Sequence, residues 1–517
     1  MQSSVHVKLV LFIFLLSLYI LTTAGYPTTS MCSSMFYTAK SLIEKGDLGL
    51  DNPTLETGIG KDGKYYIYEG LAVIIVVAIF TAVSKFIGLF PHGIFMTNHM
   101  LTAIACIILF LIGRELKYSK KTSLVLALIY GIGTMAWVHS RYLMPEPLTT
   151  VVYLSAFLFL LKYKHKGELK WLFLCGCFTG LALIVRPDAP LFILGLGIGV
   201  LALLYIQYRD GKKDVGRAVK GIILFGLPVI FFLAIYAYYN YARFGHILEL
   251  GYSTKGRVDE TSDGYGGMHK VRGIADTFVG FAGMWIIPCR SIFFINPVLI
   301  FVFWAVKDFW KKYRFEFIII GIIFTLHVLL YMNRGPTGFP GSSAWGVRYM
   351  VPMTSFMVIV MGMFVEKVVS GRHKNSYSKI FITVFIISVL FQLIGNSMTY
   401  HATQLSLEEQ YQTEEEKWNA RQTMNLDPRW NLITQNTKWL LSGRTDLMYY
   451  NYLDRENVNL NKYMWQSGVP GWVGVSLVLF IITLIVSGYL LFRTLFTPVV
   501  EPQQQKRSVK RKRKRRR

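Results

Sequence analysis

Carboxylates occur in two stretches that lie between the apolar segments of the chain. The first stretch, near the N-terminus, contains Asp51, Glu56 and Glu69, and the second is the short turn HSRYLMPEP, which contains Glu146. A carboxylate beside a membrane helix is costly to desolvate unless it is paired or lines a wet cavity. Such a group can take a proton from an attacking hydroxyl. These four residues are the candidate catalytic acids or bases, although Glu146 is equally consistent with a solvated helix cap.

Three arginines, Arg186, Arg290 and Arg348, stand beside apolar stretches and outside the basic loops. A guanidinium is weakly hydrated, and its planar fork matches the oxygens of a phosphate. These side chains could hold the phosphate of a lipid at the level of the head groups. The alternative is that each forms a structural ion pair with a loop carboxylate.

Other kinds of chemistry lack their motifs. No G-x-x-x-x-G-K-[ST] or G-x-G-x-x-G occurs where a soluble nucleotide fold could hold it, and no histidine pair has zinc spacing. The five cysteines follow no metal or redox spacing. The sequence therefore argues against an ATP-driven pump and a zinc protease, and it predicts no metal-binding residues.

Membrane helices must position the candidate residues. Hydrophobic residues make up 53% of the 517 residues and charged residues only 16%, and the apolar runs approach the roughly 20 residues that a bilayer requires. The predicted fold is an all-α polytopic bundle of about 12 transmembrane helices. We expect spans at residues 8–24, 97–116, 122–140, 148–164, 170–186, 190–207, 220–241, 292–307, 316–332, 350–367, 379–396 and 471–493.

The orientation follows from the basic residues, which give the chain a net charge of +25. By the positive-inside rule, the basic loops and both termini should be cytoplasmic. The candidate acids and arginines then share the opposite face. The tail KRSVKRKRKRRR should interact with anionic membrane lipids and not with nucleic acid. The basic loops are Arg114–Lys121, Lys162–Lys170, Arg209–Lys220, Lys307–Arg314 and Lys367–Lys379.

The first outer loop, residues 25–96, should contain surface helices. Apolar residues from Met35 to Ile43 follow helical spacing, and Gly46 then ends that helix. Residues 70–90 form a further apolar stretch, but counting it as a span would place every later basic loop outside. We therefore expect an interfacial helix there; an ordinary span is the alternative.

Seven stretches occur in an order that points to a known family. They are SMFYTAKSLIEKGDLGLDN, GKDGKYYIYEGLAVIIVVAIF, GTMAWVHSRYLMPEPL, GCFTGLALIVRPDAPLF, YNYARFGHILELGY, RSIFFINPVLIF and SSAWGVRYMVPM. With these stretches in this order, residues 5–370 resemble the GT-C superfamily of polyprenyl-phosphate-sugar glycosyltransferases. The resemblance is to the group related to protein mannosyltransferases and aminoarabinose transferases, known as glycosyltransferase family 39.

The resemblance implies transfer of a hexose or pentose from a polyprenyl phosphate to a protein, lipid or glycan acceptor, with inversion at the anomeric carbon. No cofactor would be obligatory, although a divalent metal could assist. The family commonly places an acid pair just before a tyrosine on the first surface helix, whereas this chain reads SSMFY there. The base would then be Glu56, Asp51 or Glu69. A lipid-linked-sugar flippase and a catalytically inactive scaffold of the same fold are the alternatives.

The expected organisation has four parts, in a protein of the prokaryotic plasma membrane. Residues 1–396 form the catalytic transmembrane module and residues 397–469 an extracytoplasmic region. Residues 470–495 form the last span, and residues 496–517 a disordered cytoplasmic tail.

Overall fold

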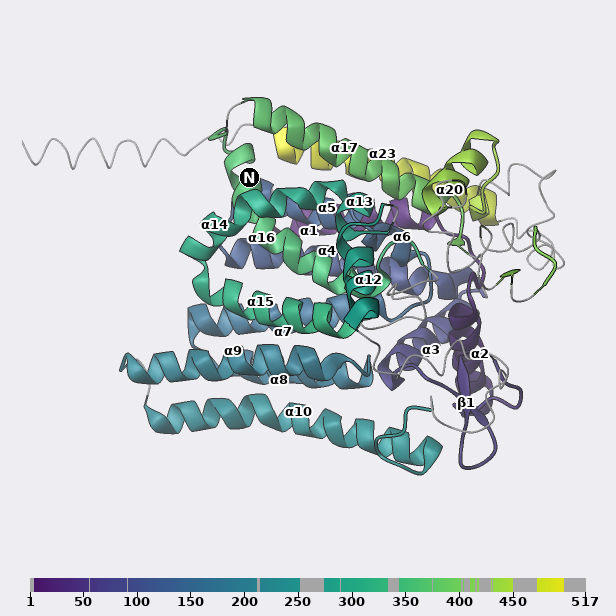
Figure 1. Ribbon diagram of the computed structural model, residues 1–517, viewed down its shortest axis with the longest axis horizontal. Helices are drawn as coiled ribbons and strands as arrows, with labels where there is room; N and C mark the ends of the chain where they lie inside the picture. Colours follow the sequence, from purple (N-terminus) through teal and green to yellow (C-terminus); the bar gives the residue numbers. More distant parts are fainter. Residues whose placement is uncertain are drawn as a thin grey trace, which may run out of the picture.

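The long apolar runs of the sequence form helices that lie side by side, as the computed structural model shows (Figure 1). The structure describes residues 4–54, 56–90, 92–211, 214–251, 274–288, 290–332, 344–373, 375–400, 403, 410–413, 416–417, 429, 431–449 and 472–496. The predicted C-terminal tail and most of the region 397–469 lie outside these ranges.

The bundle is built from helices whose bounds follow the apolar runs closely. They are α1 Ser4–Leu21, α4 Thr97–Glu115, α5 Lys120–Gly133, α6 Ala136–Ser140, α7 Glu146–Lys166, α8 Leu169–Leu181, η2 Ala182–Ile184, α9 Ala189–Arg209, α10 Val215–Phe244, α12 Ile274–Trp285, α13 Ile292–Ile295, η4 Pro297–Phe301, α14 Val302–Lys312, α15 Arg314–Tyr331, η5 Arg348–Met350, α16 Val351–Val369, α17 Asn375–Ser397, α20 Leu432–Leu441 and α23 Trp472–Phe496.

The chain is a multi-pass α-helical membrane protein. Within the described ranges, seven helices are long and apolar enough to cross a membrane, and three shorter apolar helices are Val5–Leu21, Leu71–Phe86 and Leu169–Ile184. Two predicted spans are interrupted: 122–140 is divided between α5 and α6, and 292–307 between α13, η4 and α14. Pro297 explains the second break, because proline cannot donate the hydrogen bond that continues a helix. The number of spans stays a prediction.

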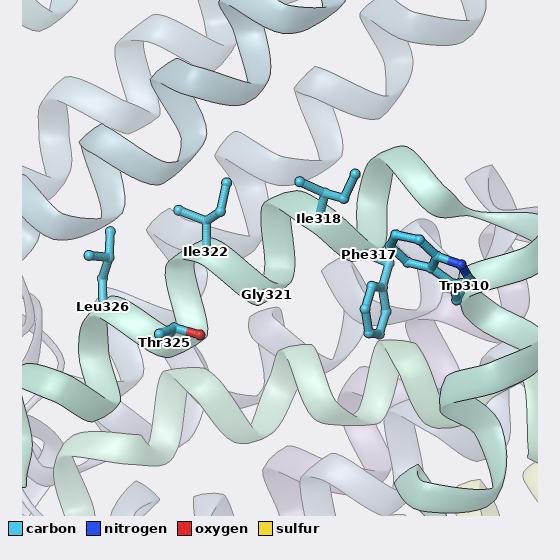
Figure 2. Close-up of a pocket in the computed structure, with 7 residues that line it drawn as sticks. All are labelled: Trp310, Phe317, Ile318, Gly321, Ile322, Thr325 and Leu326. Atoms are coloured by element: carbon cyan, nitrogen blue, oxygen red, sulfur yellow. The ribbon is translucent and has the colours of Figure 1, made fainter.

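The outer helices of the bundle present apolar side chains outward. Only 11% of the most apolar window of α10 is buried inside the protein, against 83% for the span Arg348–Val369. An open groove lies on the outer surface of α14 and α15, between Trp310 and Leu326 (Figure 2). Its lining is almost entirely apolar and contains no titratable side chain, so the groove holds no candidate for acid–base chemistry.

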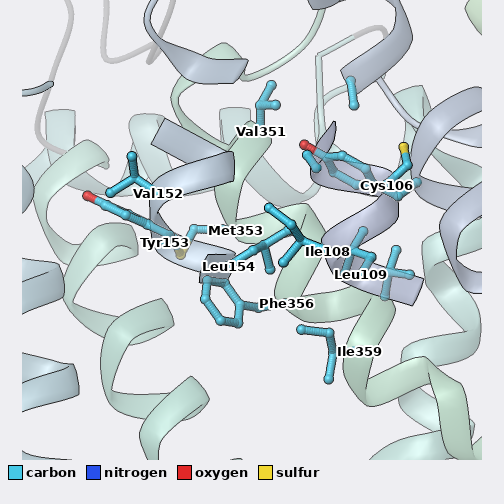
Figure 3. Close-up of a cluster of buried hydrophobic side chains, with 14 of the residues drawn as sticks. Cys106, Ile108, Leu109, Val152, Tyr153, Leu154, Val351, Met353, Phe356 and Ile359 are labelled. Atoms are coloured by element: carbon cyan, nitrogen blue, oxygen red, sulfur yellow. The ribbon is translucent and has the colours of Figure 1, made fainter. Parts of the chain in front are cut away.

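The core lies where α4, α7 and α16 meet. Leu109 of α4, Leu154 of α7 and Phe356 of α16 are buried and gather in one cluster (Figure 3). These helices are apolar on nearly all sides, as expected of helices that neighbours surround. Residues at the ends of α7 and α16 are therefore held on a rigid base.

The basic loops gather at one end of the bundle. Lys164 near the end of α7 pairs with Glu316 at the start of α15 at 2.6 Å, and Lys367 of α16 pairs with Asp308 of α14 at 2.5 Å. The turns after α14 and the N-terminus lie at this end, on the left in Figure 1. Short loops rich in lysine and arginine thus share one end, as the positive-inside pattern predicts.

The first outer loop folds at the opposite end, on the right in Figure 1. Its helix α2 (Ser30–Lys45) ends at Gly46, whose φ of 69° suits glycine, and this confirms the predicted stop. Helix α3 (Leu71–Phe86) packs against α2, followed by η1 (His92–Met96). Strands β1 (Thr57–Ile59) and β2 (Tyr65–Ile67) form an antiparallel hairpin that the sequence did not predict.

Candidate functional site

A buried ion network joins the turns before α7 and α9. Arg186 donates from Nη1 to Glu146 Oε1 at 2.9 Å and from Nε to Asp188 Oδ1 at 2.8 Å. All three residues are at least nine-tenths buried. Buried charges persist in such a place when they are paired and hydrogen-bonded. Glu146 is therefore an internal ion partner, which excludes the solvated helix cap.

Two tyrosines extend this network toward α15 and α16. The Tyr331 hydroxyl accepts a hydrogen bond from Arg186 Nη2 at 3.1 Å and donates one to Asp188. The Tyr331 ring stacks on Tyr349 with centroids 4.8 Å apart. Arg186 and Arg348 both lie over the Tyr349 ring, with guanidinium carbons 5.2 Å and 4.8 Å from its centroid. Two guanidinium groups therefore share one aromatic platform.

Arg348 is held less completely than Arg186. Its Nε lies 4.0 Å from Glu146 Oε1, too far for a hydrogen bond, and Nη2 donates to the Tyr349 hydroxyl at 3.0 Å. In the part of the chain that the structure describes, no donor reaches the second oxygen of Glu146, Oε2. The network thus retains charged groups with unused bonding capacity, which is costly in a buried place unless a ligand uses it.

Arg290 lies close to the same cluster. Its side chain is fully buried, and the charge of Arg348 acts on it. Burial, together with the like charge of Arg348, lowers the pKa of Arg290 to about 10, so the group stays cationic at neutral pH. The structure therefore brings all three predicted arginines into one neighbourhood.

Glu69 approaches the network from the first outer loop. Burial raises the pKa of Glu69 to about 7; the nearby Arg186 opposes this rise, and Glu146 adds to it. The next residue, Gly70, explains the close approach, because a Cβ there would lie 2.4 Å from the Ile184 carbonyl oxygen of η2. Only glycine lets the loop backbone pass so near the turn that carries Arg186.

The other two loop-one candidates have different positions. Glu56 accepts a hydrogen bond from the Ser30 hydroxyl at 3.1 Å, and its charge interacts with those of Glu69 and Arg348. Asp51 instead forms an exposed pair with Lys45 at 2.7 Å. The structure thus brings Glu56, Glu69 and Glu146 to the arginines and leaves Asp51 at the surface.

The network and the basic loops lie at opposite ends of the same helices. Helix α7 runs from Glu146 to Lys166, α15 from Arg314 to Tyr331, and α16 continues from Arg348 to Val369. Each of these helices therefore has a network residue at or next to one end and a basic loop at the other. This separation agrees with the predicted placement of acids and arginines away from the basic loops.

Sequence reasoning missed part of the site. Asp188 was not among the candidate acids, yet its carboxylate binds Arg186 and Tyr331 within the network. Tyr331 and Tyr349 gave no usable signal, because aromatic residues are common at the ends of membrane helices. Only the packing of α15 against its neighbours shows which tyrosines meet a charge.

The described residues offer no evident metal site. No group of three or more His, Cys, Asp or Glu side chains is arranged to hold an ion within those ranges. Arg186 forms ion pairs with Glu146 and Asp188, so these two carboxylates are not both available to bind a metal ion.

One family model matches part of the chain. Residues 93–244 match the family model described as dolichyl-phosphate-mannose-protein mannosyltransferase. This stretch runs from η1 to the end of α10 and contains Glu146, Arg186 and Asp188. This match covers part of the chain and agrees with the resemblance to the GT-C superfamily that the sequence suggested. No curated protein sequence matches the chain significantly.

Several solved structures resemble the chain at a distance. The archaeal oligosaccharyltransferase AglB from Archaeoglobus fulgidus, in complex with an inhibitory peptide and a dolichol-phosphate, is 11% identical over 83% of this chain, with a TM-score of 0.47. ArnT from Cupriavidus metallidurans in the apo state is 11% identical, covering 94% of this chain and 76% of its own, with a TM-score of 0.47. Arabinosyltransferase EmbB from Mycobacterium smegmatis is 10% identical, covering 94% and 41%, with a TM-score of 0.46. The chain spans 60% of the length of the archaeal protein.

Proposed function

We propose that the protein is an inverting glycosyltransferase that moves a hexose or pentose from a polyprenyl phosphate to a hydroxyl of a protein, lipid or glycan. One observation carries the proposal: the loop backbone at Gly70 packs against the turn that carries Arg186, so that the charge of Glu69 interacts with those of Arg186 and Arg348 at the end of the bundle opposite the basic loops. This arrangement offers a proton acceptor and an anion site side by side. The match to a mannosyltransferase family model supports a hexose, mannose among them.

The reaction follows from the charges at the site. The acceptor oxygen attacks the anomeric carbon from the face opposite the phosphate, and the bond between this carbon and the phosphate oxygen breaks. The acceptor proton passes to the Glu69 carboxylate. Arg348 and Arg290 stabilise the charge that develops on the departing polyprenyl phosphate. Arg186 stays a phosphate-binding candidate, but its contacts to Glu146 and Asp188 favour a role in holding the site together.

The same arrangement supports an orientation. We place the basic end and both termini in the cytoplasm, so that the site opens at the outer face of a prokaryotic plasma membrane. A lipid-linked donor would then present its phosphate at the outer head groups, at the level of Arg348.

The test is a transfer assay with purified protein in proteoliposomes. Radiolabelled polyprenyl-phosphate mannose, glucose, arabinose and aminoarabinose serve as donors. We expect one or more donors to release polyprenyl phosphate, and Glu69→Gln to abolish this release while the variant keeps its thermal midpoint. Movement of intact donors between leaflets without release would support the flippase and overturn the proposal. Neither release nor movement with any donor would favour the inactive scaffold.

A further inference from the structure

The hairpin that leads to Glu69 is attached to the end of α10. Arg243 is 4% exposed and donates from Nη1 to the Ile67 carbonyl oxygen of β2 at 2.6 Å. The Arg243 carbonyl oxygen accepts a hydrogen bond from the Lys61 amide of the hairpin turn at 2.9 Å. One residue thus contacts both the turn and the last strand residue, and Ile67 lies two positions before Glu69.

The Arg243 side chain is itself fixed. Its Nη2 donates to Asn240 Oδ1 at 2.9 Å, and its guanidinium lies 3.7 Å from the Tyr239 ring centroid and 4.6 Å from that of Phe244. A planar fork can serve two acceptors while stacked on a ring, whereas a lysine ammonium cannot keep that geometry. The combined contacts to Ile67, Asn240 and the Tyr239 ring therefore require arginine.

The fit of the hairpin against α10 is tight. A Cβ on Gly60 would lie 2.9 Å from the Arg243 carbonyl oxygen and 2.4 Å from the Tyr66 ring. Tyr66 also meets Phe244 edge to face, with centroids 6.1 Å apart. Close backbone approach of this kind shows that hairpin and helix end pack as one unit.

The hairpin also links the two loop-one carboxylates that reach the arginines. The Tyr68 amide donates to the Glu56 carbonyl oxygen at 3.2 Å, and the Tyr68 hydroxyl donates to the Thr57 carbonyl oxygen at 2.8 Å. Glu56 thus stands directly before β1 and Glu69 two residues after β2. A shift of the hairpin would move both carboxylates together.

We propose that Arg243 is a positioning residue, which clamps the hairpin to α10 and so holds Glu56 and Glu69 against the arginine cluster. Its consequence for catalysis rests on the proposed function. The end of α10 thereby acquires a role: it holds the hairpin that connects Glu56 and Glu69.

The clamp is tested by hydrogen exchange in nanodiscs, which needs no substrate. We expect Arg243→Lys to speed amide exchange in residues 57–69 at least tenfold, with little change in α7 and α16. The matched control is Arg217→Lys on the same helix, where Arg217 donates to the Gly167 carbonyl oxygen at the other end. Unchanged exchange in the hairpin, or equal acceleration by both variants, would overturn the clamp.

Turnover of polyprenyl-phosphate sugars tests the consequence. We expect Arg243→Lys to lower kcat at least tenfold while donor KM changes less than threefold, because the arginine cluster is untouched. The control Arg217→Lys should leave both constants unchanged. An equal loss of kcat in both variants, or a rise in donor KM as large as the fall in kcat, would overturn the positioning role. If the unaltered protein turned over no donor, the proposed function would fail, while hydrogen exchange would still decide the clamp.

Discussion

Two buried carboxylates, Asp446 and Glu146, differ in how completely their oxygens are hydrogen-bonded. Arg141, before the turn that leads to α7, donates from Nη2 to Asp446 Oδ1 at 2.6 Å and from Nη1 to the Asn396 carbonyl oxygen. Asp446 also accepts from the Thr399 amide at 2.7 Å. Glu146, after the turn, keeps its Oε2 without a donor among the described residues, and Arg348 Nε stands 4.0 Å from the other oxygen, Oε1.

The difference separates a structural charge pair from a candidate reaction site. The contact between Arg141 and Asp446 links the turn to the region after α17. Both carboxylate oxygens of Asp446 accept hydrogen bonds from protein groups. The network around Glu146 joins the turns before α7 and α9 with the end of α15 and with η5. It leaves one carboxylate oxygen of Glu146 without a donor among the described residues. A buried carboxylate with an unbonded oxygen is expected where a ligand binds, and one with both oxygens bonded where the fold is fixed.

The largest effect on stability should come from breaking the pair between Arg141 and Asp446. Asp446→Ala leaves the Arg141 charge buried without a carboxylate, which costs about 3–5 kcal/mol of folding free energy. We expect a much lower yield and thermal midpoint in detergent. Glu146→Gln should destabilise less, because Arg186 keeps Asp188 and Tyr331 as partners. Equal thermal midpoints for the two variants would remove the distinction between the structural pair at Asp446 and the network around Glu146.

Arg348 should affect ligand binding and leave stability unchanged. Loss of a hydrogen bond to a charged group costs about 1.5–3 kcal/mol, so Arg348→Ala should weaken polyprenyl-phosphate binding in nanodiscs roughly 10- to 100-fold. The thermal midpoint without ligand should stay close to that of the unaltered protein. Arg348→Lys keeps the positive charge but loses the planar guanidinium. Its affinity for polyprenyl phosphate should lie between those of Arg348→Ala and the unaltered protein. Unchanged affinity in Arg348→Ala would remove this residue from phosphate binding.

The pH dependence of turnover should follow Glu69. A base acts in its ionised form, and burial raises the pKa of Glu69 to about 7. Turnover should therefore fall about tenfold for each pH unit below 7 and level off above it. Measurement of kcat between pH 5 and 9 tests this. A profile that stays flat down to pH 5 would assign the proton to another group.

Much of the architecture could be predicted because it depends on local patterns. The apolar runs set the helix bounds, Gly46 set the end of α2, and the clusters of basic residues predicted which loops share an end. These features depend on nearby residues and on the membrane. The meeting of Glu146 with Arg186 and Arg348 followed from that sidedness, because it placed all three on one face.

The remaining features depend on contacts between distant residues. The partner of Arg141 is Asp446, 305 positions further along the chain, and no local pattern connects them. Strands β1 and β2 have three residues each, too few to show a clear alternation of apolar and polar side chains. Glu69 could be distinguished from Asp51 only once the approach of Gly70 to η2 was known.

The smallest effect on turnover is expected from substitution of Asp51. Asp51 and Glu69 lie on the same outer loop, but the Asp51 side chain is 66% exposed and pairs with Lys45. An exposed pair contributes little, because water and salt screen it. Asp51→Asn should therefore leave kcat, donor KM and the pH profile unchanged, whereas Glu69→Gln removes turnover in the same assay. A large loss of turnover in Asp51→Asn would mean that the loop rearranges when donor binds and that Asp51, in place of Glu69, takes the proton.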